Sequence, residues 1–183
     1  LWSPDGALLL TGVTSMGYNV NGVRSIEDKT LPALSLWDAQ DQSLRATLKG
    51  AKASVQCAAW SPDSTQVVST DEPNNLCIWD VPTGSQRLTL EGHSEAIQCV
   101  AWSPTGALIA SGSSDHTLRI WDAKTGEVVQ TFSGHRGAVV CVGWNKAGTR
   151  IVSGSRDGSL RVFDARTGAE HSCLQRQRSS ITC

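Results

Sequence analysis

The chain has 183 residues, of which 16 are Lys or Arg and 17 are Asp or Glu, so its formal net charge at pH 7 is −1. This balance gives no general attraction to nucleic acid or to an anionic membrane surface. No apolar run approaches the roughly 18 residues of a membrane-spanning helix, and the opening LWSPDG lacks a signal-peptide pattern. Frequent turn residues and β-branched strands predict a soluble, all-β chain with a sizeable core.

The first predicted unit covers residues 1–50 and differs from the others by an insertion. A turn, SPDG, precedes an apolar strand at 7–12, and the strand LSLWD follows at 34–38. Trp2 and Trp37 lie 35 residues apart, whereas the matching aromatic pair is separated by 19 residues in each later unit. We therefore expect an inserted loop at about 13–32, between two strands of this unit.

Three further units follow at 51–92, 93–134 and 135–176, each 42 residues long, and residues 177–183 begin another. Each predicts four short strands, which in the third unit are IQCVAW, ALIASGS, TLRIWD and EVVQTF. The connecting turns suit type I geometry, because Pro presets φ and Gly relaxes the last position in SPTG. A sheet of four such strands has two faces to cover, so the units must stack on one another.

An aromatic residue followed by Asp closes the third strand of each unit, at 37–38, 79–80, 121–122 and 163–164. A fixed period of this size is typical of repeat architectures. Together with Gly-His at 92–93 and 134–135, these phrases resemble the WD-repeat family of β-propellers. The resemblance implies an all-β propeller of four-stranded antiparallel blades, with about four blades present as an incomplete ring, and thus a fragment of a longer propeller.

A His, a Ser and an Asp recur at the same offsets in the third and fourth units, which invites a Ser-His-Asp hydrolase interpretation. A catalytic site has one nucleophile in one pocket, whereas this set is copied with the fold, so we interpret it as structural. The resemblance implies a buried hydrogen-bond network that includes the Trp of the third strand. Its expected members are His93, Ser111, Asp115, Trp121, His135, Ser153 and Asp157.

The network is expected to differ between units. Ser113 and Ser155 share a strand face with the serines two residues before them, so either pair could supply the hydroxyl. The second unit has Ala51 in the His position and Pro73 in the Asp position, and we expect its network to be lost. Phe163 has no N–H to donate, and we expect Trp to be tolerated there.

No other enzyme signature is present: the chain has no P-loop, no G-x-S-x-G and no H-E-x-x-H. His116 is interpreted as a turn residue, and His171 stands alone on a fourth strand. Four of the six cysteines also recur every 42 residues, and without a C-x-x-C spacing they predict small apolar strand residues rather than zinc ligands. We predict no catalytic site, cofactor or metal, and an intracellular location, cytoplasmic or nuclear.

The resemblance places protein binding on the face formed by the loops before the first strand and between the second and third strands. Most residues expected at this face are small and mildly polar, and several could be ordinary solvated loop positions. The candidates are Ser54, Gln56, Glu72, Ala96, Gln98, Ser114, Ala138, Val140 and Arg156. The inserted loop would lie on the same face, where Tyr18 and Arg24 could anchor a partner; a disordered loop without a ligand is the alternative.

Charge is uneven along the chain, since residues 144–183 hold seven basic and three acidic side chains, a local net of +4. The arginines of this segment could bind an acidic or phosphorylated partner, or they could be dispersed over outer strands. They are Arg150, Arg156, Arg161, Arg166, Arg176 and Arg178.

The leading functional hypothesis is a non-catalytic scaffold that assembles protein complexes, with no membrane or small-molecule ligand. An alternative comes from 151–166, which resembles the box of WD-repeat substrate receptors in cullin-RING ubiquitin ligases, with Asp157, Asp164 and Arg166 as adaptor contacts. The stretch 109–124 matches nearly as well, because the box largely restates the repeat. A sensor region of a larger signalling NTPase or kinase is another alternative, and RNA association is a third.

Overall fold

The structure is a computed structural model that describes residues 1–12, 34–48, 50, 55–71 and 74–175. In this part of the chain all regular structure is β, and the strands follow one another as antiparallel meanders. The strands are β1 (Leu8–Gly12), β2 (Leu34–Asp38), β3 (Leu44–Thr47), β4 (Ala58–Trp60), β5 (Gln66–Asp71), β6 (Asn75–Asp80), β7 (Ser85–Leu90), β8 (Ile97–Trp102), β9 (Leu108–Ser113), β10 (Leu118–Asp122), β11 (Val128–Phe132), β12 (Val139–Trp144), β13 (Arg150–Ser155), β14 (Ser159–Asp164) and β15 (Glu170–Gln175).

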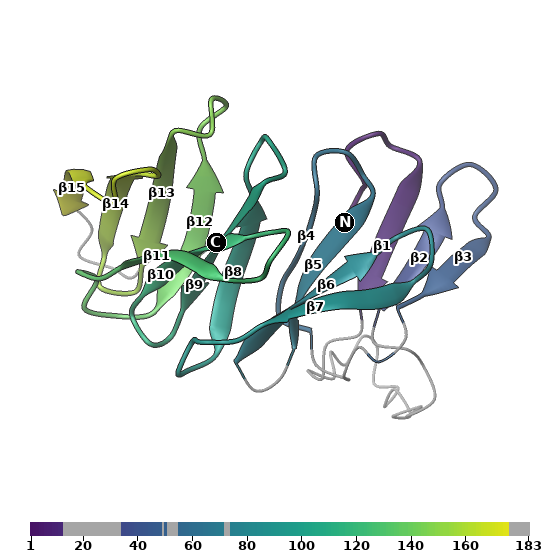
Figure 1. Cartoon of the computed structure of the whole chain (residues 1–183), viewed down its shortest axis with the longest axis horizontal. Helices are drawn as coiled ribbons and strands as arrows, with labels where there is room; N and C mark the ends of the chain where they lie inside the picture. The colour runs from purple at the N-terminus through teal and green to yellow at the C-terminus, as the bar shows by residue number, and fades with distance from the viewer. Residues whose placement is uncertain (13–33, 49, 51–54, 72–73, 176–183) are drawn as a thin grey trace, which may run out of the picture.

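These strands form four sheets, which we call blades 1 to 4. Blade 1 is β1–β3, blade 2 is β4–β7, blade 3 is β8–β11 and blade 4 is β12–β15. Figure 1 shows the blades side by side, with blade 1 at one end of the long axis and blade 4 at the other. In blade 1 a single bridge between Trp2 and Leu9 stands where the other blades have a first strand. The predicted β-propeller architecture with about four blades is confirmed.

The pairing of third and fourth strands is irregular at the same place in every blade. The register shifts between Ile120 and Trp121 in blade 3, and at the corresponding residues of the other three blades. A β-bulge adds local twist and re-aims the side chain beside it. The shift therefore places the recurring aromatic residue against the neighbouring blade.

The hydrophobic core lies between blades rather than within them, in three clusters that each join two neighbours. One set of apolar side chains from a blade meets the aromatic residue and the first-strand side of the next; we call the first surface the leading face and the second the trailing face. Between blades 2 and 3, the leading face is Val68, Leu76, Ile78 and Leu90, and the trailing face includes Ile97, Ile109 and Trp121.

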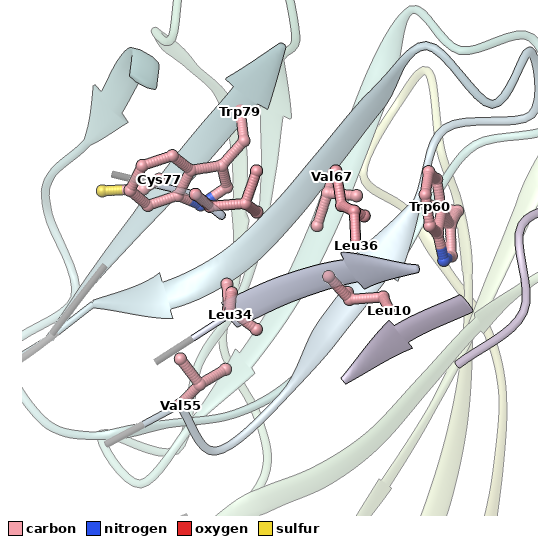
Figure 2. Packing of buried hydrophobic residues seen from close by; sticks show 9 residues of the cluster. Leu10, Leu34, Leu36, Val55, Trp60, Val67, Cys77 and Trp79 are labelled. Atoms are coloured by element: carbon pink, nitrogen blue, oxygen red, sulfur yellow. The ribbon is translucent and has the colours of Figure 1, made fainter. Parts of the chain in front are cut away.

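The cluster between blades 1 and 2 has the same layout. Leu10, Leu34 and Leu36 come from blade 1, and Trp79 comes from the third strand of blade 2. Figure 2 shows these side chains converging between β1 and β2 on one side and β5 and β6 on the other. Burying one such large apolar side chain stabilises the fold by about 1.5–3 kcal/mol, so each blade depends on its neighbour.

A second series of tryptophans, at the end of each first strand, links the inner strands. Trp60 Nε1 donates to Leu1 O at 3.1 Å, Trp102 Nε1 to Ala59 O at 3.2 Å, and Trp144 Nε1 to Ala101 O at 3.3 Å. Each bond runs from one blade to the main chain of the blade before it. The sequence shows these tryptophans at strand ends, but the bond requires the spatial arrangement of the blades.

Candidate functional site

The network of blade 3 is complete and buried. His93 Nδ1 lies 2.7 Å from Asp115 Oδ2, and His93 Nε2 lies 2.8 Å from Ser111 Oγ. Trp121 Nε1 donates to the same hydroxyl at 2.8 Å. Asp115 also accepts from the Thr117 hydroxyl at 2.6 Å. Every polar atom of the group therefore has a partner, as buried polar groups require.

The network of blade 4 follows the same plan without the indole. His135 Nε2 lies 2.8 Å from Ser153 Oγ, and His135 Nδ1 lies 3.0 Å from Ser159 Oγ and 3.3 Å from Asp157 Oδ2. The Ser159 hydroxyl donates to Asp157 Oδ1 at 2.6 Å. Phe163 occupies the aromatic position and stacks at a tilt on Phe132, with 4.8 Å between ring centroids. The seven predicted network residues are thus brought together in two separate groups.

The first two blades keep one bond of the network. Trp79 Nε1 donates to Ser69 Oγ at 2.9 Å, although positions 51 and 73 lie outside the described residues. The expectation that blade 2 loses its network is therefore wrong for this bond, since an indole and a hydroxyl pair without the histidine. In blade 1, Trp37 Nε1 donates to Thr11 Oγ1 at 2.9 Å. Sequence reasoning missed Thr11, which stands nine residues after Trp2 just as Ser69 stands nine after Trp60.

The structure also decides which serines join the network. Ser111 and Ser153 contact the histidines, as given above, whereas Ser113 and Ser155 turn toward the loop before the first strand. Ser113 Oγ donates to Glu95 O at 2.8 Å, and Ser155 Oγ donates to Gly137 O at 2.8 Å. Both pairs are structural, but only the first pair completes the histidine group.

Electrostatics fix the protonation of the blade 3 network. Burial lowers the pKa of His93 below its usual value of 6.5, although Asp115 opposes this. Burial alone would raise the pKa of Asp115, but hydrogen bonds from Thr117 and His93 outweigh it and hold the pKa at about 2. A neutral histidine therefore donates through Nδ1–H to an ionised carboxylate, and its Nε2 accepts from the Ser111 hydroxyl.

Blade 4 has the same protonation pattern. Burial lowers the pKa of His135, and the hydrogen bonds from Ser159 and the Arg136 amide lower the pKa of Asp157 despite its own burial. Although Ser-His-Asp geometry is present in both blades, Ser111 and Ser153 have no exposed surface. A substrate cannot reach either hydroxyl in this structure, so the groups hold the strands together.

The predicted binding residues of each blade lie together at one end of it. Ser114 N donates to Ala96 O at 2.9 Å, and Arg156 N donates to Ala138 O at 2.9 Å. Gln98 Nε2 donates to Ser114 Oγ at 3.0 Å. In that set Gln56 and Arg156 are exposed, and Ala96, Gln98, Ser114, Ala138 and Val140 are half-buried. Ser54, Glu72, Tyr18 and Arg24 lie outside the described residues.

The three predicted adaptor contacts are not together. Asp157 precedes β14 and belongs to the buried network, whereas Asp164 and Arg166 follow this strand at the opposite end of the blade. At about 3.3 Å per residue, the two ends are about 20 Å apart. Asp164 Oδ1 accepts from Thr167 N at 2.7 Å and Thr167 Oγ1 at 2.8 Å, which closes the turn. Arg166 is exposed.

The arginines of the C-terminal segment are dispersed. Arg161 forms an ion pair with Glu170 at 2.6 Å and is largely covered, whereas Arg150 and Arg156 are exposed at opposite ends of β13. Arg176 and Arg178 lie outside the described residues. Arg136, which the sequence did not single out, is exposed beside Arg156 on the predicted binding face, because Arg136 N donates to Asp157 Oδ2 at 2.6 Å.

Two searches of the structure concern other kinds of site. Within the described residues, no three His, Cys, Asp or Glu side chains gather as metal ligands would. In the same part of the chain, there is no helix with the length and hydropathy needed to cross a bilayer.

The comparisons with known proteins agree with the geometry. The family model described as "WD domain, G-beta repeat" matches residues 42–80, 84–122 and 126–164, three stretches of 39 residues that together make 117 of 183. Each stretch runs from the fourth strand of one blade through the third strand of the next, so one repeat joins two blades. No curated protein matches the chain. The repeats, the blades and the buried networks show that the chain belongs to the WD-repeat family.

Proposed function

We propose that this chain is a non-catalytic scaffold that binds a protein partner through the loops before the first strand and between the second and third strands. WD repeats generally serve in protein interaction, which gives the coarse function. The observation that carries the finer proposal is the attachment of both loops of a blade to one buried carboxylate.

In blade 4 this attachment is direct. Asp157, in the loop between the second and third strands, accepts from Arg136 N, in the loop before the first strand. Its other oxygen accepts from Ser159, and His135 ties the group to the second strand through Ser153. Blade 3 repeats the link, with Ser94 N donating to Asp115 Oδ2 at 3.2 Å. Loops held this way lose little conformational entropy on binding.

Charge favours an acidic or phosphorylated partner at blade 4. Arg136 and Arg156 are exposed on adjacent loop residues, and the nearby Asp157 carboxylate already accepts three hydrogen bonds from the protein. Two guanidinium groups in this arrangement suit bidentate recognition of carboxylate or phosphate. Because Cys57 and Cys173 carry free thiols, we also propose the reducing intracellular environment predicted from the sequence.

The test is affinity capture from cell extract with the wild-type chain and two variants, read by quantitative mass spectrometry. Arg136→Glu with Arg156→Glu should lose at least tenfold of the specific partners. Arg166→Ala, at the opposite end of the blade, is the matched control and should keep them. Partners that survive the double reversal would overturn the proposed face, and loss of a ubiquitin-ligase adaptor with Arg166→Ala alone would favour the substrate-receptor alternative.

A further inference from the structure

Blade 4 exposes a leading face that is covered in every other blade. Val152 is 41% exposed and Leu174 is 60% exposed. Their counterparts 84 residues earlier, Val68 and Leu90, have no exposed surface. Leu160 and Val162, on the same face, are half-buried. Blade 4 therefore presents, to solvent, the surface that blades 1 to 3 each use to hold a neighbour.

Blade 1 exposes the complementary trailing face. Trp37 is 36% exposed, whereas Trp79, Trp121 and Phe163 are 3% exposed or less. Trp2, the first member of the inner tryptophan series, is 60% exposed, whereas Trp60 and Trp102 are at most 8% exposed. The two ends of the arc thus carry the two halves of the interface that recurs three times inside it.

We propose that a second copy of this chain covers both ends, with the leading face of blade 4 packed on the trailing face of blade 1 of the other copy. The contact is heterologous, and heterologous contacts either propagate or close into rings. Two arcs of four blades make eight, which lies within the four to eight blades of ordinary propellers. A closed pair would leave neither face in water.

The internal interfaces specify the contact in detail. The tryptophan series donates to the carbonyls of Leu1, Ala59 and Ala101, and the next residue at this 42-residue spacing is Gly143. In the pair, Trp2 Nε1 of one copy would donate to Gly143 O of the other. Trp37 would pack on Val152 and Leu174, as Trp121 packs in the cluster with Val68 and Leu90.

The first test is the mass of the purified 183-residue chain by sedimentation velocity and light scattering. We expect twice the chain mass of 19.5 kDa at micromolar concentration. A monomer at 100-fold higher concentration would overturn the proposal, and so would an open-ended series of larger species, which would contradict the closed pair.

Variants then test the pairing of faces. Val152→Glu and Trp2→Glu change exposed side chains, so both should fold, and each should raise the dimer dissociation constant at least 100-fold. Val129→Glu, on β11, is the matched control: Val129 is 52% exposed but lies on neither end face, and the dimer should persist. A stable dimer of Val152→Glu would contradict the interface.

Mixing distinguishes this contact from a symmetric one. A mixture of Val152→Glu and Trp2→Glu chains retains one intact contact, between the native blade 4 of one and the native blade 1 of the other, so mixed dimers should form although neither variant dimerises alone. If blade 4 instead met blade 4, Trp2→Glu would dimerise normally and the mixture would gain nothing. That result would overturn the proposed arrangement.

Discussion

Trp121 Nε1 donates to Ser111 Oγ across 2.8 Å, and neither side chain has exposed surface. Trp121→Phe removes the donor and leaves a buried hydroxyl with one partner fewer, so we expect a loss of about 1–3 kcal/mol in the free energy of unfolding. Urea denaturation measures it. Trp37→Phe is the control: its indole bonds Thr11 similarly, but water can replace it at this exposed position, and the cost should stay below about 1 kcal/mol. Both are compared in the Val152→Glu background, and equal costs would contradict the role of burial.

Phe163 shares its interface with Phe132, whereas Trp121 shares its interface with the smaller Leu90. The ring contact at 4.8 Å changes the expectation from sequence that Trp is tolerated at 163. Phe163→Trp should overpack the cluster and destabilise by about 1–3 kcal/mol. Adding Phe132→Leu restores the Leu–Trp combination of blade 3 and should recover most of the loss, as a double-mutant cycle in urea can show. A single variant as stable as wild type would mean that the ring moves freely.

The networks predict a stability that falls in two steps as the pH decreases. A histidine whose pKa is lower in the folded chain stabilises only while neutral, so the contributions of His93 and His135 are complete above 6.5 and decline below it. The contribution of Asp115 is complete above 3.8 and is lost as the pH falls toward about 2. Unfolding free energies between pH 8 and pH 2 should show both declines.

Replacing both histidines isolates the upper step. The double variant with His93→Gln and His135→Gln should be less stable at pH 8, yet its stability should change little between pH 7 and pH 5. The lower step should remain, because Asp115 still accepts from Thr117. An unchanged upper step in this variant would show that other groups cause it.

His116 adopts a left-handed backbone conformation, with φ of 68°, where blade 4 has Gly158 with φ of 81°. This conformation costs a residue with a Cβ about 1–2 kcal/mol, part of which glycine returns through its unfolded-state entropy. His116→Gly should therefore stabilise the chain by about 0.5 kcal/mol. Gly158→Ala is the reciprocal change and should destabilise it. Thermal unfolding can resolve the two signs, and a shared sign would contradict the backbone explanation.

The 42-residue period predicts the blades well, because every third strand must place its aromatic–Asp pair at the same point of the sheet. The histidine groups were predictable for the same reason, as the residues recur at fixed offsets. Thr11 was not, because the insertion breaks the period and a Thr replaces the Ser. The charge at Arg161 was also misleading, since only the paired strands bring Glu170 within 2.6 Å.

The inner tryptophans illustrate what the pattern leaves out. Each one reads as an apolar strand end, and nothing nearby in sequence indicates an acceptor, because that acceptor belongs to another blade 43 residues earlier in two of the three cases. Contacts between repeats depend on the curvature of the array. The sequence contains this curvature only implicitly, through the sizes of the side chains between blades.

The acceptors of these indoles are main-chain carbonyls, which any residue supplies. Substitutions in the preceding blade therefore leave the docking bond intact, and a blade gained by duplication or lost by deletion finds the same acceptor on its new neighbour. This indifference to side-chain identity permits a lineage to change its number of blades without redesigning the inner wall of the ring.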